Sequence, residues 1–63
     1  MTALPKLGAP ATRALVGAGL ETLESVAGLP ESRLLGLHGF GPRGVRILNE
    51  ALAAAGLPPL GRP

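Results

Sequence analysis

The chain has 63 residues and a formal charge of +2; it contains neither Cys nor Asp, and His38 is its only His. This length fits one small domain, which buries only ~60% of its unfolded surface on folding. The composition excludes a disulfide scaffold, a zinc site and a thiol nucleophile, and it leaves no credible acid–base pair. We therefore expect no enzyme, no cofactor and no metal.

Two short helices are predicted in the first half of the chain. The first opens at Pro10, because a first helical turn does not need the missing N–H, and it ends at Gly17. Thr22 is the expected N-cap of a second helix over residues 23–27, which Gly28 closes.

Two further helices are predicted in the second half. The third opens at Pro30 and ends before Gly39, and the fourth runs from Pro42 to about residue 55. Their spacing predicts buried stripes of apolar side chains. The expected inward-facing residues are Leu34, Leu35 and Leu37 on the third helix, and Val45, Leu48, Leu52 and Ala55 on the fourth.

No segment shows the alternation and β-branched content of a strand, so the expected fold is all-α, a compact bundle of four to five short helices. We expect a single domain over residues 1–63, with a core over 4–57 and a tail over 58–63. The longest stretch without a charge, residues 51–61, is too short to span a bilayer. A cytoplasmic protein without a membrane partner is therefore predicted.

An internal repeat relates the two halves of the chain. Residues 14–20 parallel residues 51–57, and upstream a second set of positions matches at an offset of 33. Each half is therefore predicted to be a tight turn followed by a helix. The second set pairs Leu4, Leu7, Gly8 and Arg13 with Leu37, Phe40, Gly41 and Arg46.

The Gly-rich turn before the fourth helix is the sharpest feature of the sequence. Gly39 and Gly41 permit a tight bend, and Phe40 between them is expected to point into the core. The next helix then begins with unpaired backbone N–H groups, which favour a bound anion. Arg43 would add positive charge there, and Gly44 would leave room for a phosphate.

The same residues have alternative interpretations. The turn glycines suit any close connection between two helices, and Arg43 on its own suits a solvated surface. Arg46 could pair with Glu50 one helical turn later. His38 is more often a structural hydrogen-bonding group than a ligand. The dinucleotide pattern G-x-G-x-x-G is also matched here, but it requires a preceding strand, whereas a helix is predicted.

Residues 37–43, together with Val45 and Leu48, resemble the helix-hairpin-helix family of DNA-binding motifs. Over residues 4–57 the chain is similar to the C-terminal domain of the alpha subunit of RNA polymerase, and to small standalone relatives of that domain. The resemblance implies a SAM-like, all-α domain with one clear and one degenerate hairpin. It also implies binding of double-stranded DNA from the minor-groove side, through backbone N–H groups and basic side chains on phosphates.

The leading hypothesis is therefore a non-enzymatic module that binds double-stranded DNA largely independently of sequence. Single-stranded binding by stacking is disfavoured, because Phe40 is the only aromatic residue. The alternative is a protein-interaction or scaffold module that uses an exposed surface at residues 53–60. The expected DNA-binding residues are Gly39, Gly41, Arg43, Gly44 and Arg46, with a second contact at Lys6, Gly8 and Arg13.

Overall fold

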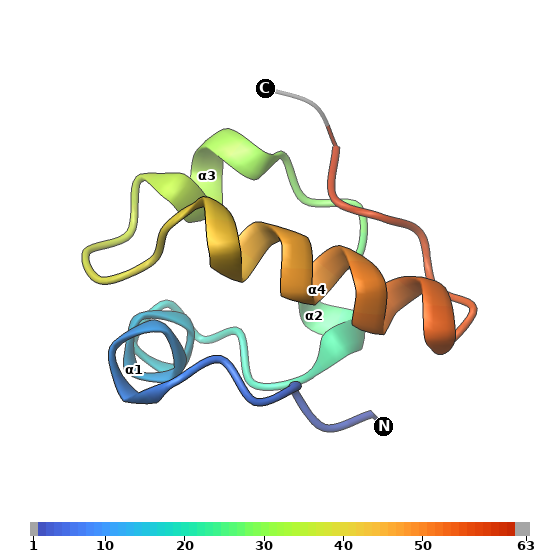
Figure 1. The fold of residues 1–63 in the computed structure, drawn as a ribbon, viewed down its shortest axis with the longest axis horizontal. Helices are drawn as coiled ribbons and strands as arrows, with labels where there is room; N and C mark the ends of the chain where they lie inside the picture. Colours follow the sequence, from blue (N-terminus) through green and yellow to red (C-terminus); the bar gives the residue numbers. More distant parts are fainter. Residues whose placement is uncertain (1, 62–63) are drawn as a thin grey trace.

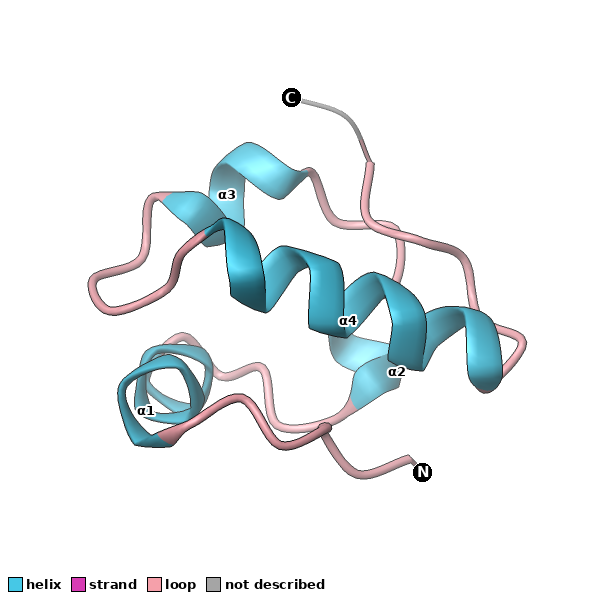
Figure 2. Ribbon diagram, in the orientation of Figure 1, coloured by secondary structure: helices cyan, strands magenta, loops and turns pink. Residues whose placement is uncertain are grey.

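The computed structural model describes residues 2–61 and shows an all-α fold for them (Figures 1 and 2). In this part of the chain, four helices follow one another, and two isolated backbone bridges are the only β-type pairing. None of these helices has the length and apolar character needed to cross a bilayer. The helices are α1 (Ala9–Gly17), α2 (Leu23–Val26), α3 (Glu31–Leu35) and α4 (Pro42–Ala54).

The two helices of the first half begin and end close to the predicted positions. Pro10 lies in the first turn of α1, which follows Gly8. α2 begins with a capping box: the Ser25 N–H donates to Thr22 Oγ1, and the Thr22 N–H donates to Ser25 Oγ, each at 3.2 Å. Such reciprocal capping satisfies two amides that a helix start otherwise leaves unpaired, which suits a helix of only four residues.

Helix α4 is the longest of the four and crosses the middle of the molecule, with α3 packed beside its first half (Figure 1). Its predicted stripe is confirmed at Val45, Leu48 and Leu52, which are buried. The third helix is shorter than predicted, since α3 ends at Leu35 rather than just before Gly39, and three expected inward-facing residues are not fully buried. Leu35 is 41% exposed, because it follows the fully buried Leu34 directly and therefore points away from the core on α3. Leu37 lies past the end of α3 and is partly buried, and Ala55 lies beyond the end of α4 at the surface.

The hydrophobic core draws on every helix and on segments between them. Phe40 is buried, as the sequence predicted. The core also reaches past residue 57, the boundary expected from the sequence, because Leu60 is only 6% exposed and its N–H donates to Asn49 Oδ1 at 2.9 Å. The buried hydrophobic residues are Ala11, Leu15, Leu20, Leu23, Val26, Leu34, Phe40, Val45, Leu48, Leu52 and Leu60.

The burial of Leu60 changes the interpretation of the C-terminal segment. Residues 58–61 were expected to be a tail, and 53–60 an exposed contact surface. Instead, Leu57 is partly buried against the core and Gly61 pairs with Pro30 in a backbone bridge. After the double proline ends any helix, the chain returns across the structure, so its apolar side chains complete the core. The rest of the expected tail, residues 62–63, lies outside the described residues.

Candidate functional site

The four helix starts differ in how their backbone N–H groups are satisfied. The start of α2 has its capping box, and the Leu23 N–H also donates to the Thr2 carbonyl at 2.9 Å. At the start of α3 the Glu31 N–H donates to the Gly61 carbonyl at 2.8 Å. Segments from the two ends of the described chain thus occupy the amides of these short helices.

The starts of α1 and α4 lack such partners. Both have a glycine N-cap, Gly8 and Gly41, and neither has a side-chain cap. Within residues 2–61, no hydrogen-bond acceptor is found for the N–H groups of Gly39, Gly41 or Arg43. Unpaired amides at a helix start carry partial positive charge, so they favour an anion from outside the chain.

The fold brings these two helix starts together. Gly39 in the turn packs directly against Pro10 in the first turn of α1: a Cβ at residue 39 would lie 3.1 Å from the Pro10 carbonyl oxygen. In Figures 1 and 2 the loop between α3 and α4 accordingly lies over α1. The starts of α1 and α4, which the sequence predicted as separate features of the two halves, therefore lie at the same end of the molecule.

Two of the three glycines in and after the turn, Gly39 and Gly44, are required by the fold, each for a different reason. Gly39 has a φ of +88°, which side chains disfavour, and it touches Pro10. Gly44 is buried beneath Phe40, since a Cβ there would lie 2.9 Å from the ring, and its N–H donates to the Gly41 carbonyl. At Gly44, internal packing thus explains the missing side chain; a DNA contact there stays a prediction.

Gly41 is required by neither backbone conformation nor packing. Its φ of −128° and ψ of −177° are extended values that any residue adopts, and a Cβ there would meet nothing within 4 Å. A polar N-cap residue would fit this position and would satisfy an amide of α4. The glycine leaves those amides open instead.

The predicted basic residues are all exposed, but the structure divides them between two surfaces. Arg13 lines a pocket beside the turn, whereas Arg46 lines a different pocket on the α3 side of α4. Lys6 and Arg43 line neither pocket. Among the side-chain hydrogen bonds of residues 2–61, none joins Arg46 to Glu50.

The pocket at the junction of α1 and the turn has a volume of about 390 Å³. We call it the junction pocket; its lining residues are Pro10, Arg13, Ala14, His38 and Gly39. The sequence offered one signal for His38, its position next to Gly39, but only the contact between Gly39 and Pro10 brings it to the same pocket as Arg13. Sequence reasoning therefore missed it as a site residue.

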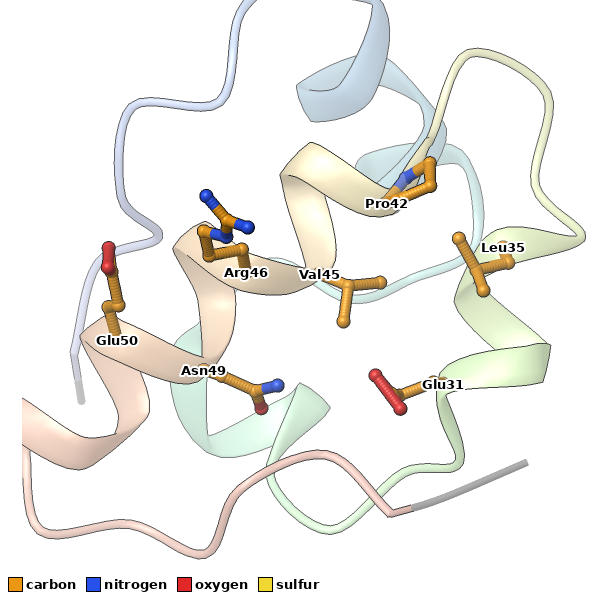
Figure 3. A pocket seen from close by; sticks show the side chains of 7 residues that line it. All are labelled: Glu31, Leu35, Pro42, Val45, Arg46, Asn49 and Glu50. Atoms are coloured by element: carbon orange, nitrogen blue, oxygen red, sulfur yellow. The ribbon is translucent and has the colours of Figure 1, made fainter.

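A second pocket, of about 380 Å³, separates α3 from α4, and we call it the interhelical pocket (Figure 3). The side chains of Leu35 and Glu31 on α3 face Val45 and Asn49 on α4 across it (Figure 3). Arg46 and Glu50 of α4 also line this pocket. The carboxylates on this surface make it a poor site for an anion. Its lining residues are Glu31, Leu35, Pro42, Val45, Arg46, Asn49 and Glu50.

Within the described residues, no group of three or more His or Glu side chains gathers where a metal ion could bind. The chemistry available at the two helix starts is therefore that of backbone amides, Arg and His, all of which donate hydrogen bonds to oxyanions. Comparisons with protein-family models, with curated proteins and with solved structures found no match for this chain.

Proposed function

We propose that this protein is a non-enzymatic helix-hairpin-helix module that binds the phosphate backbone of double-stranded DNA from the minor-groove side. The turn at Gly39 to Gly41 is the hairpin, and α4 is its second helix. The open amides of Gly41 and Arg43 bind one phosphate, and the Arg43 side chain adds a charge-assisted contact. Arg46, one turn further along α4, contributes at longer range.

The proposed binding is largely independent of DNA sequence. Phosphate contacts position a protein on the duplex without reading bases, and α4 carries no row of Asn, Gln and Arg for the major groove. With about two to four phosphates neutralised, the affinity is modest, and its logarithm falls with the logarithm of salt concentration with a slope of roughly −2 to −4.

The open N-cap at Gly41 supports this proposal most directly. The amides of α2 and α3 have partners within the chain, whereas α4 begins with a glycine that the fold does not require and with amides that have no acceptor in residues 2–61. A phosphate oxygen is the missing acceptor in this proposal. It would also offset the unfavourable position of the Arg43 charge at the positive end of the helix.

Gly41→Ser tests the proposal because it separates folding from binding. Ser is at least as good an N-cap as Gly, so the free energy of unfolding should be unchanged or should rise by a few tenths of a kcal/mol. The new hydroxyl would accept from an α4 amide and so compete with the phosphate. We expect a loss of duplex affinity of about three- to tenfold at low salt, measured by fluorescence anisotropy with a mixed-sequence duplex.

Gly17→Ser is the matched control, because Gly17 is exposed, lines neither pocket, and a Cβ there would meet nothing within 4 Å. This variant should bind like the wild type. Wild-type binding that is absent at low salt or insensitive to salt, or a Gly41→Ser protein that binds normally, contradicts the proposal.

A protein-interaction module is the second candidate, and the interhelical pocket is the observation that favours it. Leu35 is exposed there beside Val45 and Glu31. This arrangement suits a partner segment with an apolar side chain next to a Lys or Arg. Leu35→Arg would abolish such binding and leave duplex affinity unchanged, whereas Gly41→Ser would do the reverse. Titration with a peptide of that chemistry, followed by NMR, distinguishes the two candidates.

A further inference from the structure

We infer that the junction pocket binds a sugar–phosphate unit of the duplex, with Arg13 and His38 as its two side-chain donors. This inference rests on the proposed function and extends it: DNA would be held by amides at α4 and by side chains at α1. The assignment of His38 as a DNA-contacting residue is new to the site, and it follows from the tertiary structure alone.

The lining of the pocket matches the two parts of such a unit. Pro10, Ala14 and Gly39 form an apolar surface, against which the carbons of a deoxyribose ring can pack. Arg13 and His38 present N–H donors to a phosphate. A bare inorganic phosphate would use only the polar half of this surface.

The charges around the pocket favour an anion. Among the residues that line it, Arg13 on α1 is the only charged one, and no carboxylate is present. The interhelical pocket, which has nearly the same volume, is lined by Glu31 and Glu50. Of these two cavities, only the junction pocket can therefore accept a phosphate without placing it beside like charge.

The local structure also explains why side chains are needed here. Pro10 occupies the position in the first turn of α1 where Arg43 stands in α4, so α1 has no N–H there. Gly39 lies against Pro10, which keeps the pocket within reach of a strand bound at the turn. Arg13 and His38 supply side-chain donors beside the position where Pro10 leaves α1 without an N–H.

The test compares Arg13→Gln and His38→Gln with the wild type and with Arg33→Gln, a charge-matched control in α3 that lines neither pocket. Each pocket variant should lose about three- to tenfold in duplex affinity, and Arg13→Gln should reduce the salt slope by about 1. Circular dichroism checks that each variant folds.

Two further comparisons separate a failure of the pocket inference from a failure of the proposed function. In an NMR titration, a duplex should shift the His38 ring and Ala14 methyl resonances together, whereas inorganic phosphate at the same ionic strength should leave the Ala14 methyl unchanged. If both pocket variants bind like the wild type while Gly41→Ser does not, the pocket inference is overturned and the proposed function stands. If the wild type binds no duplex, the proposed function itself fails.

Discussion

The first turns of α1 and α4 start from the same sequence pattern and present different chemistry. Each follows a glycine N-cap and contains a proline, but the proline is the second residue of α1 and the first residue of α4. Consequently α4 keeps the N–H of Arg43, while α1 has Pro10 at the same position. A shift of one residue in the proline thus leaves α4 with one more backbone N–H at this position of its first turn than α1 has.

The two halves also differ in the sizes of the side chains at equivalent positions near the two turns. In α4 the Phe40 ring lies over Gly44, whereas the positions 33 residues earlier are Leu7 and Ala11. The second half thus combines a large side chain with a position that has none, whereas the first half has Leu and Ala at the equivalent positions; Ala11 is buried and Leu7 packs against the core. Together, the pairs show how one pattern fills different spaces in the same core.

Among the substitutions that test this difference between α1 and α4, Arg43→Glu should change duplex affinity the most. The change removes the cation at the α4 start and adds an anion where the amides would bind phosphate, so duplex affinity should fall by about ten- to a hundredfold at low salt. Arg13→Glu at α1 should cost less, and Arg33→Glu should leave affinity within about twofold. Anisotropy titrations of the three variants establish the order; an equal loss in all three would show that only net charge matters.

Gly44→Ala should have the next largest effect, on stability. The new methyl group would lie 2.9 Å from the Phe40 ring, and we expect the free energy of unfolding to fall by about 1–3 kcal/mol despite the better helix propensity of Ala. Adding Phe40→Leu copies the pair found in the first half and should recover part of that loss. Urea denaturation of the single and double variants gives the coupling energy; simple additivity would contradict the packing argument.

A smaller effect, on stability at low pH, is expected from the contact between Thr2 and Glu24 of α2. The Thr2 hydroxyl and the Thr2 N–H donate to the Glu24 carboxylate at 2.6 and 2.8 Å, respectively. These hydrogen bonds, that of the hydroxyl most strongly, lower the pKa of Glu24 to about 2 from an ordinary 4.5. The charged form is the stabilised one. Its contribution is therefore present above pH 4.5 and is lost as the pH falls toward 2. Thermal unfolding from pH 6 to pH 2 should show this loss in the wild type and less of it in Glu24→Gln.

Pro10→Ala should have the smallest effect and makes the two helix starts more alike. The substitution restores an N–H to the first turn of α1 and keeps the Cβ that faces Gly39. We expect duplex affinity to rise by at most about threefold, and stability to fall slightly because the unfolded chain gains freedom. Titration of a mixed-sequence duplex measures the change, and a clear loss of affinity would show that Pro10 itself contacts the DNA strand.

Local signals in the sequence specify the helices of this protein. Proline starts, glycine ends and the Thr22 cap act over a few residues, so the all-α fold, the approximate helix bounds and the burial of Phe40 could be predicted locally. The end of the third helix and the burial of Leu35 were predicted wrongly, because α3 is short and adjacent leucines on it cannot both face the core. The burial of Leu60 was missed because it depends on a contact with a distant part of the chain.

Which groups become neighbours is settled by the folded chain. Three features join residues at least 20 positions apart: the contact of Gly39 with Pro10, the pairing of Thr2 and Gly61 with the starts of α2 and α3, and the presence of His38 and Arg13 in one pocket. Such contacts depend on how apolar faces pack in three dimensions, and no local propensity encodes them. For this reason the turn could be identified from its glycines, while the distinction between open and occupied helix starts required the three-dimensional arrangement.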